Sequence, residues 1–198
     1  MNRREALKRV AILTGGALST SIVSAVLSGC TFGDGGKKWT PKIVTPEQNN
    51  LITTIAELII PETDTPGAKA AGVNEFIDSM LADWFTLTER NHFIKGLADL
   101  DARAQENHST TFVICTVEEQ TAILEQLEKE SLAHRDNNPP QDDPNNVLKP
   151  FFSQMKELTL TGYYTSEIGA TQELKYFEAS NHYDGCVPFN EIGRAWSN

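Results

Sequence analysis

The feature that most constrains the fold is a helix start signal followed by apolar residues three and four positions apart. Thr45-Pro46-Glu47-Gln48 supplies an N-cap residue, a proline at the first helical position and a glutamine that can complete a capping box. Apolar side chains at the spacing that follows lie on one face of a helix. The helix is predicted to end at Pro61. Its apolar residues are Leu51, Ile52, Ile55, Leu58 and Ile59.

The same pattern recurs along the chain. Asn74 can cap a second helix, Thr86 or Thr88 can start a third, and Thr116-Val117-Glu118-Glu119 is a further capping box before a fourth. No segment alternates convincingly between apolar and polar residues, as a half-buried strand does. We therefore expect an all-α fold, an irregular helical bundle with long loops. The apolar sets are Phe76, Ile77, Met80, Leu81 and Trp84; Phe93, Ile94, Leu97 and Leu100; Ile123, Leu124 and Leu127; and Phe151, Phe152, Met155, Leu158, Gly162 and Tyr163.

Polar or turn-rich stretches separate these helices. Residues 61–67 form a turn-rich loop, and residues 135–146 contain no aliphatic residue and three prolines, which predicts a loop or disorder. The tail from Thr165 to Asn198 is less periodic. The length suits one domain, so we assign residues 45–198 to a single helical domain.

An export signal is predicted over residues 1–29. Arg3-Arg4-Glu5-Ala6-Leu7-Lys8 resembles a twin-arginine signal, with Arg3, Arg4, Leu7 and Lys8 in the expected places. The apolar run that follows is diluted by glycine, serine and threonine, which is typical of a cleavable secretory signal. An uncleaved N-terminal membrane helix is the alternative.

Leu27-Ser28-Gly29-Cys30 resembles a bacterial lipobox, in which Cys30 is lipidated and becomes the first residue of the mature protein. Residues 30–44, rich in glycine, lysine and threonine, then form a flexible tether. If the N-terminal helix is not cleaved, the cysteine is incidental. The lipobox places the protein in the periplasm, anchored to a membrane by its lipid.

The charge excludes one class of partner. The chain has a net charge of −10; its first 29 residues carry four basic side chains against Glu5, so the remainder carries −13. Nucleic-acid binding requires a basic patch and is therefore not expected.

Two cysteines remain beside Cys30. Outside the cytoplasm Cys115 and Cys186 can pair with each other, bridge to a partner chain, or stay as small hydrophobic residues. The sequence leaves these alternatives open.

No catalytic equipment is evident in the sequence. The four histidines do not form HExxH or HxH, and there is no Gly-x-Ser-x-Gly or phosphate-cradling glycine loop. Acidic residues are abundant, and a pair of them is more simply explained as solvated surface than as an acid–base couple. We predict neither a metal site nor enzymatic activity for the chain itself.

Two segments are candidates for contact with a partner. Residues 59–68 follow an apolar helix and form a loop that can contact a partner. The alternative is that this loop is only a rigid connection between two helices. Residues 158–169 contain Tyr163 and Tyr164, of which one ring is expected on the core face and the other partly free. Tyrosine is favoured at protein interfaces, although a core tyrosine beside an ordinary surface tyrosine explains the pair equally well.

Together these motifs resemble the gluconate 2-dehydrogenase subunit 3 family over residues 45–186. The most specific are the loop Ile-Ile-Pro-x-Thr-Asp-Thr-Pro-Gly-Ala and the segment Gly-Tyr-Tyr-Thr-Ser-Glu-x-Gly; Val-x-x-Phe-Ile-Asp and Tyr-x-Gly-Cys accompany them. The matching positions that we take as candidate partner contacts are Pro61, Asp64, Pro66, Gly67, Tyr163, Tyr164, Glu167 and Tyr183.

The resemblance implies a division of labour. A large flavoprotein subunit carries FAD and oxidises a sugar or sugar acid, and a cytochrome c subunit passes electrons through haem to the respiratory chain. The small subunit carries no cofactor and helps to fold, export and stabilise the large one. A flavoprotein already folded around FAD would cross the membrane through the twin-arginine translocase on this chain's signal. Gluconate is only the namesake, because specificity resides in the large subunit.

The alternative from another class is a stand-alone periplasmic lipoprotein that acts as a binding or scaffold module. It would be a stable monomer with no flavoprotein attached.

Overall fold

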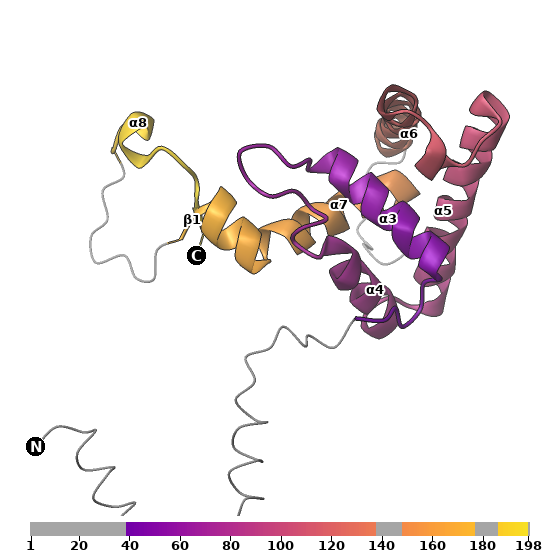
Figure 1. Ribbon diagram of the computed structural model, residues 1–198, viewed down its shortest axis with the longest axis horizontal. Coiled ribbons are helices and arrows are strands. Elements are labelled where there is room, and N and C mark those ends of the chain that lie inside the picture. The colour runs from indigo at the N-terminus through magenta and orange to yellow at the C-terminus, as the bar shows by residue number, and fades with distance from the viewer. Residues whose placement is uncertain (1–38, 138–147, 177–185, 198) are drawn as a thin grey trace, which may run out of the picture. The chain divides into compact units, whose positions relative to one another are not determined.

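The computed structural model describes residues 39–137, 148–176 and 186–197 and divides the chain into two units, Met1–Trp39 and Thr40–Asn198. The second unit is mostly helical, which confirms the expected all-α class (Figure 1). Its longer helices are α3 (Pro46–Ile59), α4 (Val73–Asp83), α5 (Leu87–His108), α6 (Val117–Asn137) and α7 (Phe151–Tyr164). The shorter elements are η1 (Phe112–Ile114), η2 (Gly169–Glu173), β1 (Lys175–Tyr176), α8 (Phe189–Ile192) and β2 (Trp196–Ser197).

Helix α7 is the centre of the bundle, because α3, α4, α5 and α6 all pack against it. Its buried side chains include Phe151, Met155 and Tyr163. Close approach is possible where a neighbouring residue is small: a Cβ at Gly96 of α5 would lie 2.2 Å from the Phe151 ring. Every residue of α7 that the sequence placed on the core face is buried.

The helices begin where their capping residues predict, with one exception. In α3, the Thr45 hydroxyl accepts from the Gln48 N–H at 3.2 Å and the Gln48 side chain accepts from the Thr45 N–H at 2.9 Å. The third helix begins after Thr86, one of the two expected starts. The expectation that Asn74 caps α4 is wrong.

The N-cap of α4 is Gly72, which has a φ of +68°. This left-handed conformation suits glycine and lets the chain enter the helix two residues earlier than expected. Asn74 lies inside the helix, and its side-chain amide donates to Asn49 Oδ1 at 2.9 Å.

Two further differences concern the loops and the tail. Helix α6 continues to Asn137, so the first residues of the expected polar loop are helical and the rest lies outside the described residues. The tail contains a π-helical turn, η2, and two strands of two residues each, β1 and β2, which pair in parallel. Strands this short carry no alternation that a sequence pattern could reveal.

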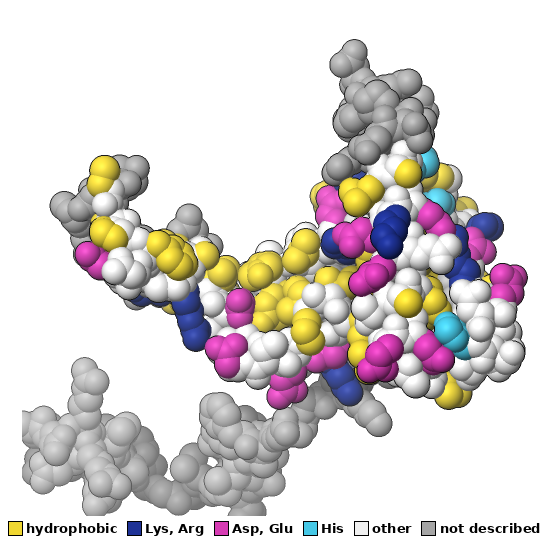
Figure 2. All heavy atoms as spheres, turned by 90° about the horizontal axis from the view of Figure 1, so that it is seen from above, with side chains coloured by type: hydrophobic (Ala, Val, Ile, Leu, Met, Phe, Trp, Pro, Cys, Tyr) yellow, Lys and Arg dark blue, Asp and Glu magenta, His cyan; other side chains and the backbone are white. Residues whose placement is uncertain are grey.

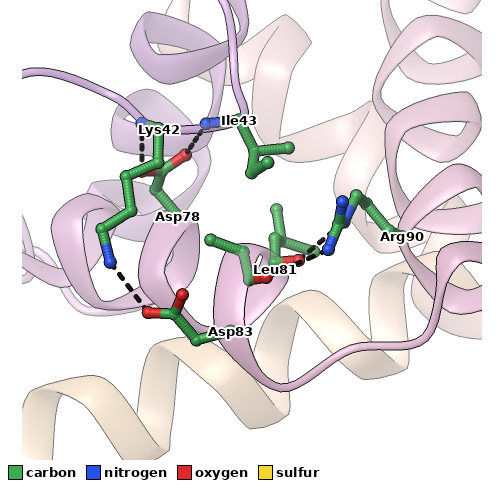
Figure 3. A network of polar contacts seen from close by, with 7 residues as sticks. Lys42, Ile43, Asp78, Leu81, Asp83 and Arg90 are labelled. Carbon is green, nitrogen blue, oxygen red and sulfur yellow. Dashed lines mark hydrogen bonds and ion pairs between the residues drawn. The ribbon is translucent and has the colours of Figure 1, made fainter.

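The segment before α3 is fixed to α4 by Asp78, a fully buried carboxylate (Figure 3). Asp78 Oδ2 accepts from the Lys42 N–H at 2.7 Å, and Oδ1 accepts from the N–H groups of Ile43 and Val44 at 3.0 and 3.1 Å. The Lys42 ammonium also donates to Asp83 at 2.8 Å. The last residues of the expected tether are therefore held against the folded unit.

Residues 1–29 and Cys30, for which an export signal and a lipid were expected, lie outside the described residues. Among the helices that are described, none has the length and apolar character needed to span a membrane.

Candidate partner-binding site

The α3–α4 loop is organised around the carboxylate of Glu57. Glu57 accepts from the backbone N–H of Glu62 at 3.0 Å and from that of Lys69 at 2.8 Å, and the Ala68 N–H closes the loop by donating to the Ile60 carbonyl at 2.9 Å. A Cβ at Gly67 would lie 2.4 Å from Glu57 Oε1 and 2.6 Å from the Glu62 nitrogen. The loop is therefore a rigid turn in which position 67 has no room for a side chain.

This loop meets the C-terminal end of α7. The Tyr163 hydroxyl donates to the Pro66 carbonyl at 2.8 Å, across 97 positions of sequence. The Thr65 hydroxyl donates to Glu173 Oε2 at 2.6 Å, which fixes the loop to η2 as well. The two segments that the sequence singled out separately thus form one unit (Figure 1).

The two adjacent tyrosines divide as the sequence predicted. Tyr163 is 1% exposed and belongs to the core, whereas Tyr164 is 40% exposed. Their rings meet edge to face, with centroids 5.3 Å apart and planes at 84°. Burial raises the pKa of the Tyr163 hydroxyl, so it remains a neutral hydrogen-bond donor to Pro66 at physiological pH. Leu160, one turn before Tyr164, is also exposed.

A tight turn carries the chain from α7 into η2. The Ser166 hydroxyl donates to the Tyr163 carbonyl at 2.6 Å and accepts from the Gly169 N–H at 3.0 Å. A Cβ at Gly169 would lie 2.0 Å from the Tyr163 carbonyl oxygen, so the turn requires glycine there. Because of this turn, Glu173 reaches Thr65.

Apart from Tyr183, the remaining predicted contact residues lie on or next to this unit. Pro61 and Asp64 are exposed on the loop, and Asp64 accepts from the Thr63 hydroxyl at 3.2 Å. Glu167 is exposed just after α7. Tyr183 lies outside the described residues. We call the exposed set the loop–tyrosine surface; its residues are Pro61, Asp64, Leu160, Tyr164 and Glu167.

Sequence reasoning missed the residues that build the frame under this surface. Glu57, Thr65 and Glu173 act through partners that lie between 5 and 108 positions away. Glu57 resembles any polar residue on the outer face of its helix, and no spacing rule connects it to the loop. Only the adjacent Thr-Pro-Gly turn residues gave a local signal.

The two cysteines occupy different environments. Cys115 is buried, its thiol is free, and its pKa is raised, chiefly by burial. Cys186 is exposed on the tail. The pairing of Cys115 with Cys186 or with a partner chain stays a prediction.

Two hollows are lined by other described residues, not by those of the loop–tyrosine surface. One, of about 330 Å³, lies between α4 and α7 and is lined by Met80, Trp84 and Leu158. The other, of about 470 Å³, is lined by Leu51, Leu97 and Ile114. Over the described ranges, no three His, Cys, Asp or Glu side chains are grouped so that they could hold a metal ion.

Comparison with known proteins identifies the chain at the level of family. The family model for gluconate 2-dehydrogenase subunit 3 matches residues 46–181, a range that includes the α3–α4 loop, both tyrosines and η2 but ends before α8. No curated protein and no solved structure gives a significant match. The matched range covers more than half of the sequence and contains the assembled site. The chain belongs to the gluconate 2-dehydrogenase subunit 3 family.

Proposed function

We propose that this chain is a non-catalytic accessory subunit that binds, escorts and stabilises an FAD-containing dehydrogenase subunit at the cell envelope. The observation that carries the proposal is the rigid joining of the α3–α4 loop to α7 and η2 through Tyr163–Pro66 and Thr65–Glu173. A preorganised surface loses little conformational freedom when a partner docks, which favours binding.

The exposed members of the loop–tyrosine surface suit a protein partner. Tyr164 and Leu160 supply apolar contact area, while Asp64 and Glu167 supply charge at its edge. In this proposal the oxidation of the sugar or sugar acid belongs entirely to the larger subunit, which holds the FAD. A cytochrome c subunit accepts the electrons.

Export and anchoring follow from the N-terminal sequence. The arginine pair Arg3-Arg4 would direct the pre-assembled complex to the twin-arginine translocase, which carries folded cargo. Lipid on Cys30 would then hold the complex in the periplasm at a membrane. Asp78 supports this arrangement, because it ties the end of the tether to the folded unit.

The test is an affinity pull-down of the tagged full-length chain from solubilised native membranes, followed by an absorbance spectrum. A flavin spectrum and a second, larger chain are the expected results. A colourless monomer, together with normal export of the larger subunit in a strain that lacks this chain, would instead support the stand-alone lipoprotein.

Variants of the two tyrosines locate the contact. Tyr163→Phe keeps the ring and removes the bond to Pro66, so the loop loosens and the yield of flavoprotein falls. Tyr164→Ala removes exposed contact area and is expected to reduce the yield further. Leu132→Ala, on α6, is the matched control, since Leu132 is exposed to a similar degree, 43% against 40%. Equal yields from all three variants would contradict the placement of the contact.

A further inference from the structure

The C-terminal arm, residues 186–197, has no core of its own. All of its residues with described side chains are exposed except the half-buried Val187. Helix α8 is a single turn, and β2 pairs with β1 over two residues only, Lys175 opposite Trp196 and Tyr176 opposite Ser197. The arm also lies beyond residue 181, where the family match ends.

The described contacts between the arm and the rest of the chain include several with residues 172–176. The Lys175 N–H donates to the Ala195 carbonyl at 2.8 Å, and the Lys175 ammonium lies 4.6 Å from the centre of the Trp196 ring. The Arg194 guanidinium donates to the Gln172 carbonyl. These are contacts of exposed groups, and each is weak where water competes.

Contacts of this exposed kind contribute little against the entropy of ordering twelve residues. Apolar burial normally offsets that entropy, and a two-stranded sheet is marginal even when its strands are longer. Parallel pairs in particular are normally covered on both faces. The arm therefore has a defined geometry that its own burial does not support.

What the arm presents instead is aromatic surface. Phe189 is 71% exposed, Trp196 44% and the neighbouring Tyr176 57%. Figure 2 shows hydrophobic side chains gathered over this part of the chain, at the left of the view, and over the surface beside it. Exposed aromatic residues in this number are typical of the centre of a protein interface.

We propose that the arm is a clamp that orders fully when its aromatic side chains dock on the FAD-containing larger subunit. The inference rests on the proposed function, and family membership as a dehydrogenase subunit supplies the partner. A second copy of this chain fits less well, because each mature chain carries −13 and the copies repel. The loop–tyrosine surface then provides the rigid contact, and the arm slows dissociation.

The test compares hydrogen exchange in the purified full-length chain and in its complex with the larger subunit. Peptides over residues 186–197 are expected to exchange at least tenfold more slowly in the complex, while peptides from the interior of α5 stay unchanged. The substitutions Phe189→Ala and Trp196→Ala are expected to raise the dissociation rate of the complex about tenfold each. Ile114→Ala, which alters a residue 74% exposed on η1, is the matched control.

Each other outcome overturns the inference in a distinguishable way. If the complex forms but exchange and dissociation are unaffected, the clamp is wrong and the escort function stands. If no complex forms, both the clamp and the escort function are wrong. A dimer in light scattering that Phe189→Ala abolishes would assign the arm to a second copy. Binding of the chain to phosphatidylethanolamine–phosphatidylglycerol vesicles that Phe189→Ala abolishes would assign it to the membrane.

Discussion

Asp78 and Glu57 each accept hydrogen bonds from more than one backbone amide. Asp78 is fully buried and receives three consecutive N–H groups from residues 42–44. Glu57 receives two from the α3–α4 loop. A buried amide left without an acceptor is costly, so Asp78 stabilises the placement of residues 42–44, of which Val44 is itself part of the core. The amides that Glu57 accepts from are exposed, and its role is to hold the shape of the loop.

Substitution of Asp78 tests this at the residue scale. In Asp78→Asn one oxygen is replaced by an NH₂ group, which places a donor against the N–H of Lys42 or of its neighbours. We expect a loss of about 1–3 kcal/mol in the free energy of unfolding, measured by urea denaturation.

Asp83→Asn is the control for Asp78→Asn. It removes only the exposed ion pair with Lys42, whose side chains are 68% and 52% exposed, and should cost less than about 1 kcal/mol. Equal losses for the two variants would contradict the role assigned to the buried carboxylate.

At the scale of elements, helix boundaries follow from local chemistry and the assembled site does not. The capping boxes at Thr45 and Thr116 and the apolar periodicity predicted the major helices correctly, because those signals lie within one or two turns. The prediction that Asn74 is the N-cap of α4 was wrong because Gly72, in a left-handed conformation, starts the helix two residues earlier. The site residues Glu57 and Glu173 were not predictable, since their partners depend on how the chain folds back.

The α5 capping box gives a prediction with a pH dependence. The Thr86 hydroxyl and N–H bond the Glu89 carboxylate and lower its pKa. The stability that the ionised Glu89 carboxylate adds to the folded protein is therefore present above the unfolded pKa of about 4.3. It is lost as the pH falls through the lower pKa that Glu89 has in the folded protein. Thr86→Ala should cost about 1 kcal/mol at neutral pH, and the difference from wild type should narrow in acid.

Thermal or urea unfolding at several pH values measures that difference. Thr88→Ala is the control, because Thr88 lies inside α5 and alanine is the better helix former by about 0.5 kcal/mol. A Thr86→Ala deficit that stays constant into acid would show that Glu89 does not participate.

At the scale of the whole molecule, one chain combines a helical body, a rigid contact surface and an arm with no core. The body has a buried apolar core of its own, although Trp84, Leu87 and Ile114 are exposed on it, whereas none of the described side chains of the arm is fully buried. This contrast matches the proposed accessory role, in which the subunit folds alone and becomes complete in the complex.

The proposed export role predicts the effect of changing the arginine pair. The double substitution Arg3→Lys and Arg4→Lys keeps the charge but disrupts the twin-arginine pair, so both this chain and the larger subunit should stay in the cytoplasm while the flavin complex still forms. Cell fractionation followed by absorbance spectroscopy measures both results. Arg9→Lys, outside the pair, should export normally. Normal export of the larger subunit in the double variant would contradict the escort role.

The hydrogen bonds from Asp78 to residues 42–44 also fix where the tether that starts at Cys30 ends. If Cys30 carries lipid as proposed, twelve peptide units run from Cys30 to the N–H of Lys42, a distance of at most about 43 Å when fully extended. The proposed anchor would then keep Lys42 within that distance of the membrane surface, and with it a flavoprotein bound to this subunit. Lengthening the tether with glycine and serine should therefore slow electron transfer to the membrane while leaving the flavoprotein bound and reducible by its substrate.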